Sequence, residues 1–192
     1  ARLEVKRKAI QIAAHSRRRS WQLAALLLGQ MRNEELVPNE MAYGAAMSAC
    51  EKNHRWKEAL AIFEQMASSA VEPNVVICSI AMSSFGRASL VEEALALLQR
   101  VPPNVVAYCA AITACTRGRQ WTAALNLLQQ MAEEHVALNA AACTSVMGAC
   151  EKGHQWQASL AILGQMPLHG VKPDVMSFVS AATACKLGTQ WS

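Results

Sequence analysis

The chain has 192 residues, of which 53% are hydrophobic and only 5% aromatic, which is enough apolar material for the core of one domain. The longest stretch without Asp, Glu, Lys or Arg, residues 153–171, contains His, Gln and Pro, which excludes a membrane span of roughly 20 apolar residues. The net charge of +4 is unevenly placed, because residues 1–39 carry +5 and residues 40–192 carry −1.

Five Trp residues mark an internal repeat. They are Trp21, Trp56, Trp121, Trp156 and Trp191, and their spacings are 35, 65, 35 and 35 residues. The gap of 65 equals one unit of 35 and one of 30, so one unit lacks a Trp and five residues. The sequence predicts a single domain over 1–192, built from units 5–39, 40–74, 75–104, 105–139 and 140–174 and a partial unit over 175–192.

The first predicted unit, 5–39, holds seven of the 18 Lys and Arg residues, six of them in the runs 6–8 and 17–19. A solvated helix face would account for these runs, but such charge also suits RNA, an acidic partner or a membrane surface. Among proteins, we expect the region 6–19 to contact an acidic partner.

The second unit, 40–74, shows the pattern of two helices. Small and apolar residues fill most of 40–52, "NHR" interrupts them, and "WKEALAIFEQM" then places Trp56, Leu60 and Phe63 on one stripe at helical spacing. Pro73 prevents the second helix from continuing. His54 and its counterpart His154 precede the second helices and are interpreted as turn residues. Because one helix pair cannot bury such faces alone, the pattern predicts an all-α solenoid of stacked pairs.

The third unit, 75–104, is the short one, with "LLQRVPPN" in place of "IFEQMASSAVEPN". The missing residues belong to the end of its second helix, so we expect a local change in pitch without a break in the stack. The partial unit 175–192 stops where a second helix should begin, at Trp191. Since solenoids need covered ends, we expect further chain or a partner to cover this end.

Seven cysteines are spread along the chain without a C-x-x-C pair. An odd number in this arrangement argues against a disulfide framework and against a zinc site. We expect free, buried thiols, and we predict no metal site and no cofactor. The deaminase, P-loop and G-x-S-x-G patterns are also missing from the sequence, so we predict that the chain is not an enzyme.

The repeated unit resembles the pentatricopeptide repeat. The resemblance rests on the length of 35, on Tyr43 at the fourth place, on Glu58-Ala59-Leu60 after the turn, on Met66, and on Pro73-Asn74 at the end. The tetratricopeptide repeat, with 34 residues, has a different aromatic pattern. The resemblance implies a right-handed α-solenoid that binds single-stranded RNA in mitochondria or chloroplasts, with one base read per unit.

The resemblance also implies which residues meet the RNA backbone. A basic residue stands at the thirteenth place of every full unit, and these residues are Arg17, Lys52, Arg87, Arg117 and Lys152. Cations in register along a groove are what phosphate contacts need. The first helix of each unit also ends there, however, and basic side chains are favoured at a helix C-terminus in any protein.

Base reading is assigned by the resemblance to the fifth and last residues of each unit. Thr144 with Asp174 matches a pair associated with guanine, and Ser79 with Asn104 resembles one associated with adenine. Cys109 with Asn139 is a poorer donor–acceptor pair. The second residues, which flank the base in the family, are Lys6, Met41, Val76, Val106, Ala141 and Met176. Asn and Asp at the last place also fit plain turn chemistry.

Two functions remain open from the sequence. The first is RNA binding in organellar RNA metabolism. The second is a protein scaffold or accessory subunit of a large organellar complex, whether ribosomal, photosynthetic or respiratory. The basic thirteenth places favour the first, and the charge of −1 over residues 40–192 favours the second.

Overall fold

The computed structural model of the chain describes residues 2–17, 20–34, 36–69 and 71–188, and within them all regular secondary structure is helical. The helices are α1 (Arg2–Arg17), α2 (Trp21–Asn33), α3 (Glu40–Lys52), α4 (Trp56–Ser68), α5 (Val75–Arg87), α6 (Val91–Leu98), α7 (Val105–Arg117), α8 (Trp121–Glu133), α9 (Ala140–Lys152), α10 (Trp156–Gln165) and α11 (Val175–Leu187), with a 3-10 turn at Met166–His169. None of these helices is both long and apolar enough to cross a bilayer. The predicted helix start at Trp191 lies outside the described residues.

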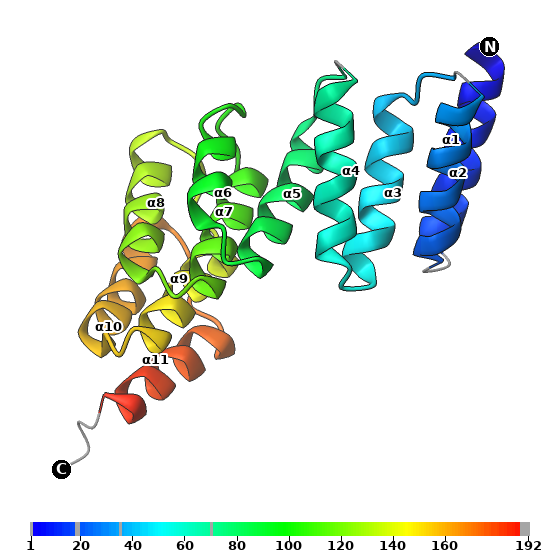
Figure 1. Ribbon diagram of the computed structural model, residues 1–192. Helices are drawn as coiled ribbons and strands as arrows, with labels where there is room; N and C mark the ends of the chain where they lie inside the picture. The colour runs from blue at the N-terminus through cyan, green and yellow to red at the C-terminus, as the bar shows by residue number, and fades with distance from the viewer. Residues whose placement is uncertain (1, 18–19, 35, 70, 189–192) are drawn as a thin grey trace.

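The helices pack as an α-solenoid with two layers. The odd-numbered helices form one layer, in which each contacts the next from α1 to α11. Each even-numbered helix packs on the odd helix before it and on the one after it, while the even helices described here make no comparable contact with one another. As a result α1 and α11 lie at opposite ends of an elongated stack (Figure 1). A groove of about 800 Å³ separates α4 from α6.

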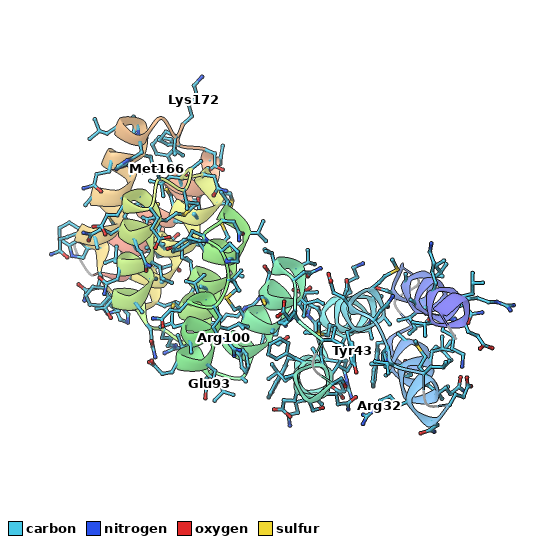
Figure 2. All side chains as sticks on the ribbon, turned by 90° about the horizontal axis from the view of Figure 1, so that it is seen from above. Arg32, Tyr43, Glu93, Arg100, Met166 and Lys172 are labelled. Atoms are coloured by element: carbon cyan, nitrogen blue, oxygen red, sulfur yellow. The ribbon has the colours of Figure 1, made fainter. Side chains whose placement is uncertain are left out.

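The core runs through the whole stack rather than gathering at one centre. Its largest fully buried side chains come from corresponding places of different units, such as Tyr43 with Tyr108 and Met47 with Met147. Figure 2 shows Tyr43 inside the stack, among the side chains between neighbouring helices. Small residues of the odd layer, such as Ala42, Ala46, Ala111 and Ala114, are completely buried and let the helices approach.

The short unit changes the packing on one side. Its second helix, α6, has eight residues, whereas α4 and α8 have thirteen. The neighbouring odd helices α5 and α7 meet closely at Gly86, where an added Cβ would lie 2.5 Å from the Cα of Ala114. That distance is too short for any side chain, so a glycine is required for this approach.

Packing between units explains why the sequence motif around Gly153 and Trp156 recurs. A Cβ added on Gly153 would clash with the indole ring of Trp121, and one on Gly188 would clash with the ring of Trp156. Trp121 and Trp156 therefore each pack against the turn of the following unit. At Asn53, which stands in the place of these glycines, the guanidinium of Arg55 instead lies 4.6 Å from the centre of the Trp21 ring.

The turn between the two helices of a unit uses a left-handed residue. His54, Ser89, Arg119 and His154 occupy the same place in four units and have φ between 56° and 62°. The next residue closes the turn, as in the bond from the N–H of Arg55 to the carbonyl of Cys50 at 2.9 Å. His54 and His154 are thus turn residues, as the sequence predicts.

Replacing Ser89 with Gly should therefore raise the free energy of unfolding by about 0.5 to 1 kcal/mol, because Gly accepts a left-handed backbone without a Cβ penalty. Urea unfolding followed by circular dichroism measures the change. Ala61→Gly, on the exposed side of α4, is the control and should lose about 1 kcal/mol. A loss at both positions would contradict the strain at Ser89.

The cysteines are free, as the sequence predicts, and all but Cys109 and Cys185 are buried. Burial raises the pKa of the thiols of Cys50, Cys115 and Cys150 to about 11, since a thiolate is poorly solvated there. These three residues are packing groups of the odd layer and carry no reactive thiolate at neutral pH.

Candidate nucleic-acid interface

The last residue of each unit caps the next odd helix. In Asn39, Asn74, Asn104, Asn139 and Asp174 the side-chain Oδ1 accepts a hydrogen bond from a backbone N–H three residues on, at 2.7–3.0 Å. The turn chemistry anticipated from the sequence is therefore present at every one of these places. Capping occupies Oδ1 and holds the side chain at the helix N-terminus. The amide Nδ2 of each Asn takes no part in the cap.

Two of the three predicted base-reading pairs are brought together. The Sγ of Cys109 lies 4.0 Å from Oδ1 of Asn139. Thr144 and Asp174 are linked through Ser177, whose Oγ lies 3.4 Å from Oγ1 of Thr144 and donates to Oδ1 of Asp174 at 2.8 Å.

The third pair is not joined by a hydrogen bond in the described residues. Oγ of Ser79 donates to the carbonyl of Val75 at 2.7 Å, and Nδ2 of Asn104 donates to the carbonyl of Pro102 at 2.6 Å. Each partner is therefore occupied within its own segment, beside the shortened helix α6.

The protonation of these side chains follows their surroundings. Hydrogen bonds from the side chain and then the backbone N–H of Ser177 hold the pKa of Asp174 below its ordinary value, so this exposed carboxylate is charged at neutral pH. Burial raises the pKa of Cys109, against a smaller opposing effect of Asn139, and keeps the thiol protonated. Asp174 is thus an anionic acceptor, whereas Cys109 offers only a weak donor.

A row of exposed side chains accompanies these pairs. The second residues Met41, Val76, Val106 and Met176 are each more than half exposed, although they are apolar. Lys6 and Ala141 are exposed at the same place. Lys6 lies on the second turn of α1. The other members of the row lie on the first turn of successive odd helices, beside the capping residues, so apolar surface and hydrogen-bonding groups alternate along one edge of the odd layer from α3 to α11.

The basic residues occupy the opposite end of the same helices, each on the last turn of an odd helix. Lys52 is exposed, and Nζ of the exposed Lys152 donates to the carbonyl of Thr116 at 3.2 Å. Arg117 reaches back to α5, where its guanidinium donates to Ser83 O at 3.0 Å and Ser83 Oγ at 2.9 Å. Arg87 is half-buried, and its Nε has no hydrogen-bond partner. The side chain of Arg17 lies outside the described residues.

Burial and the neighbouring charge of Arg87 lower the pKa of Arg117, while the nearby carboxylate of Glu51 opposes them. The two arginines therefore lie close enough to repel each other where α5 meets α7. We call the thirteenth-place residues Arg17, Lys52, Arg87, Arg117 and Lys152 the basic column. Lys52 and Lys152 are its more exposed members, whereas Arg117 serves partly as a link between helices α5 and α7.

The basic N-terminal region is only partly available. Lys6 and Arg7 are exposed on α1, but Lys8 pairs with Glu34 after the end of α2. Arg18 and Arg19 lie outside the described residues. Sequence reasoning missed two residues of the surface, Ser83 and Ser177. The capping-box spacing of Asp174 and Ser177 could have identified the second, whereas Ser83 has no local signal.

Comparison with known proteins agrees with this architecture. A family model described as pentatricopeptide repeat domain matches residues 26–88, and a second, described as PPR repeat, matches 76–101 and 106–136. Together the matches cover more than half of the chain. No curated protein matches the sequence significantly.

Several solved structures share the fold. The pentatricopeptide repeat protein PPR10 from maize is similar with a TM-score of 0.75 and 18% identity, over 91% of this chain and 26% of that one. The PPR domain of Arabidopsis thaliana protein-only RNase P 1, solved in complex with tRNA, gives 0.75 and 14%, over 92% and 95%. Nuclear proteinaceous RNase P 2 from A. thaliana gives 0.77 and 11%, over 92% and 41%. The chain thus spans about a quarter of the maize protein, and identities this low establish the fold alone.

Proposed function

Because the chain belongs to the pentatricopeptide repeat family, we propose that it binds single-stranded RNA along the layer of odd-numbered helices. One observation carries the proposal. The odd helices place a row of exposed apolar residues and capping polar groups at their first turns and basic residues at their last turns, unit after unit. This arrangement offers both a surface for unstacked bases and cations for the phosphates.

Within this function, Thr144 and Asp174 are the best candidates to read a base, with guanine as the base that the family pattern associates with them. Their link through Ser177 fixes both side chains, and Asp174 is an exposed anionic acceptor. Cys109 with Asn139 and Ser79 with Asn104 are weaker candidates, since one has a poor donor and the other is occupied within its own segments.

Lys52 and Lys152 are proposed as the main phosphate contacts, with Arg17, Arg87 and Arg117 as further members of the column. Changing Lys52 and Lys152 together to Ala should weaken RNA binding and lower the slope of log K against log salt by about 1.4, from about 0.7 for each lost phosphate contact. Fluorescence anisotropy with a labelled single-stranded RNA of mixed sequence, repeated over a series of salt concentrations, measures the slope.

The matched control changes Lys57 and Lys172 to Ala, because both are exposed and neither belongs to the column. Figure 2 shows Lys172 extending away from the body of the stack. An equal fall in slope for both double variants would mean that the RNA is attracted by net charge alone. If the unmodified chain binds no RNA near physiological salt, the proposal is wrong.

Asp174→Asn should shift the preference at one RNA position from guanine toward adenine by about tenfold, because the amide can donate where the carboxylate only accepts. Asn also caps a helix, so α11 keeps its N-terminus. Binding to RNAs that differ at a single base, measured with Thr144 unchanged, tests this prediction. Loss of affinity for every base would instead identify a structural role for Asp174.

The proposed setting is RNA metabolism in a mitochondrion or chloroplast, and the support is the family's usual location. Binding without catalysis is the proposed mode of action. Fractionation of the source cells, followed by detection of the protein with an antibody, tests the location. Recovery from the cytosol alone would rule it out.

A scaffold for other proteins is the second candidate. Two observations favour it. The guanidinium of Arg117 donates hydrogen bonds to Ser83 within the protein, and residues 40–192 carry a net charge of only −1. The salt-slope experiment separates the candidates. A chain that binds no RNA but co-purifies with a defined set of organellar proteins would be a scaffold.

A further inference from the structure

The guanidinium of Arg87, at the end of α5, has donors without acceptors. The side chain is half-buried, and its Nε is buried with no hydrogen-bond partner. Its two terminal nitrogens form no hydrogen bond or ion pair within the part of the chain that the structure describes. A buried N–H without an acceptor is costly, because the group has lost its contact with water. An acceptor for Arg87 therefore has to come from outside the described residues.

A second arginine is held beside Arg87. The Nη1 atom of Arg117 on α7 donates to the carbonyl oxygen of Ser83 at 3.0 Å and to its Oγ at 2.9 Å. Ser83 and Arg87 are four residues apart on α5, so they lie on the same face of that helix. The bonds to Ser83 therefore place the guanidinium of Arg117 about one helical turn from the point where the side chain of Arg87 begins.

The close approach of α5 and α7 brings the two arginines together. An added Cβ on Gly86 would lie 2.5 Å from the Cα of Ala114, so the two backbones meet with no side chain between them. Arg87 directly follows Gly86, and Arg117 comes three residues, or almost one turn, after Ala114. Both arginine side chains therefore leave their helices beside this contact, at the same end of the odd layer.

The charges at this contact are not balanced by the protein. Burial and the charge of Arg87 lower the pKa of Arg117, and the carboxylate of Glu51 on α3 opposes them. Neither arginine forms an ion pair with a carboxylate of the described residues, where the only ion pairs are Lys8 with Glu34 and Arg55 with Glu58. Two positive charges thus face each other with one negative charge in the neighbourhood, so a bound anion would relieve their repulsion.

A phosphate group has the chemistry that this pair of arginines lacks. Its oxygens carry negative charge and accept several hydrogen bonds, and the planar fork of a guanidinium matches their geometry. Nε and Nη2 of Arg117 take no part in the bonds to Ser83, so they remain as donors. The guanidinium of Arg87 keeps all of its donors. One phosphate between the two side chains would therefore supply the missing acceptor and the missing negative charge.

We propose that Arg87 and Arg117 form a clamp that binds a single phosphate group, so that units 75–104 and 105–139 share one phosphate of the RNA. That the phosphate belongs to RNA rests on the proposed function, whereas the clamp itself rests on the unpaired guanidinium and on the α5–α7 contact. Lys52 and Lys152 differ, because α3 and α9 make no comparable contact with each other, and each lysine binds its own phosphate. The short unit thus adds one phosphate contact fewer than the basic column implies.

The salt dependence of RNA binding counts the phosphates that are bound. Arg87→Gln and Arg117→Gln, made together, should lower the slope of log K against log salt by about 0.7, the value for one phosphate of a single strand. Lys52→Gln and Lys152→Gln, made together, are the matched control, because they remove the same charge and should lower the slope by about 1.4. A fall of about 1.4 for the arginine pair, or no fall, would overturn the proposal.

Inorganic phosphate tests the clamp without RNA. About 20 mM phosphate in place of chloride, at constant ionic strength, should raise the melting midpoint of the unmodified chain by about 2 °C, because the anion binds only the folded state. The lysine double variant should keep this rise and the arginine double variant should lose it. Circular dichroism verifies folding, and Arg87→Gln alone, which breaks no bond of the protein, should lose the rise as well.

The two measurements separate the clamp from the proposed function. No rise in the unmodified chain, or an equal rise in all variants, would overturn the clamp whether or not RNA binds. A rise that depends on Arg87 and Arg117, in a chain that binds no RNA, would support the clamp as a site for free phosphate and contradict the proposed function.

Discussion

Replacing Tyr108 with Ala is expected to lower the free energy of unfolding by about 3 to 5 kcal/mol, the usual cost of truncating a fully buried aromatic side chain. Tyr108 is 2% exposed and lies between α7 and the end of α8. Its removal would leave a cavity where α7 meets the end of α8. Urea unfolding followed by circular dichroism measures the loss.

Tyr108→Phe separates the ring from its hydroxyl. The hydroxyl donates to Oε2 of Glu134 at 2.8 Å, and because Glu134 is exposed, the loss should be about 1 kcal/mol or less. Burial, helped by the adjacent Glu134, raises the pKa of Tyr108 to about 12, so its phenol remains protonated until strongly alkaline pH. A loss as large for Phe as for Ala would show that the hydrogen bond, rather than packing, dominates at this site.

Gly86→Ala is expected to cost about 3 kcal/mol, even though only one methyl group is added. The new Cβ would lie 2.5 Å from Cα and 2.8 Å from Cβ of Ala114, and neither atom belongs to a flexible side chain. Helices α5 and α7 would have to separate, which would also strain the bonds from Arg117 to Ser83. Thermal and urea unfolding should both report the loss.

The matched control is Gly29→Ala in α2, where an added Cβ meets nothing within 4 Å. This variant should gain up to about 1 kcal/mol, since Ala is the better helix former. The same chemical change is therefore expected to have opposite signs at two positions. If Gly86→Ala proved as favourable as Gly29→Ala, the close approach of α5 and α7 would be refuted.

Much of the fold follows from a few residues of the sequence. The spacing of the Trp residues predicts the repeat, and Trp21, Trp56, Trp121 and Trp156 do begin helices. Local signals sufficed because each unit is built from short-range contacts: a Pro-Asn end, a helix, a turn and a second helix. The turn role of His54 and His154 could be inferred for the same reason.

The sequence could not predict how closely neighbouring odd helices approach. Gly86 looks like any other helical glycine, and its role depends on Ala114, a residue 28 positions away in the next unit. The packing of Trp121 against Gly153 was not predicted either. The recurrence of Gly118, Gly153 and Gly188 at intervals of 35 residues was a signal that could have been used.

For the candidate interface, the sequence located the residues but not their bonds. Asn139 and Asp174 stand where the repeat predicts, and the structure adds that both cap helices. Arg117 was assigned to RNA by its place in the unit, and only the structure reveals its bond to Ser83 across the α5–α7 contact. Their roles toward RNA stay predictions until binding is measured.

The two layers also make the solenoid easier to bend than to stretch. Adjacent odd helices touch along the whole stack, whereas a groove of about 800 Å³ lies between α4 and α6. Bending that widens or narrows such grooves breaks few contacts, while stretching the odd layer would break many. The chain should therefore behave as an elastic rod in which the layer of odd-numbered helices resists stretching. Its curvature could then adapt to a ligand that binds along the stack.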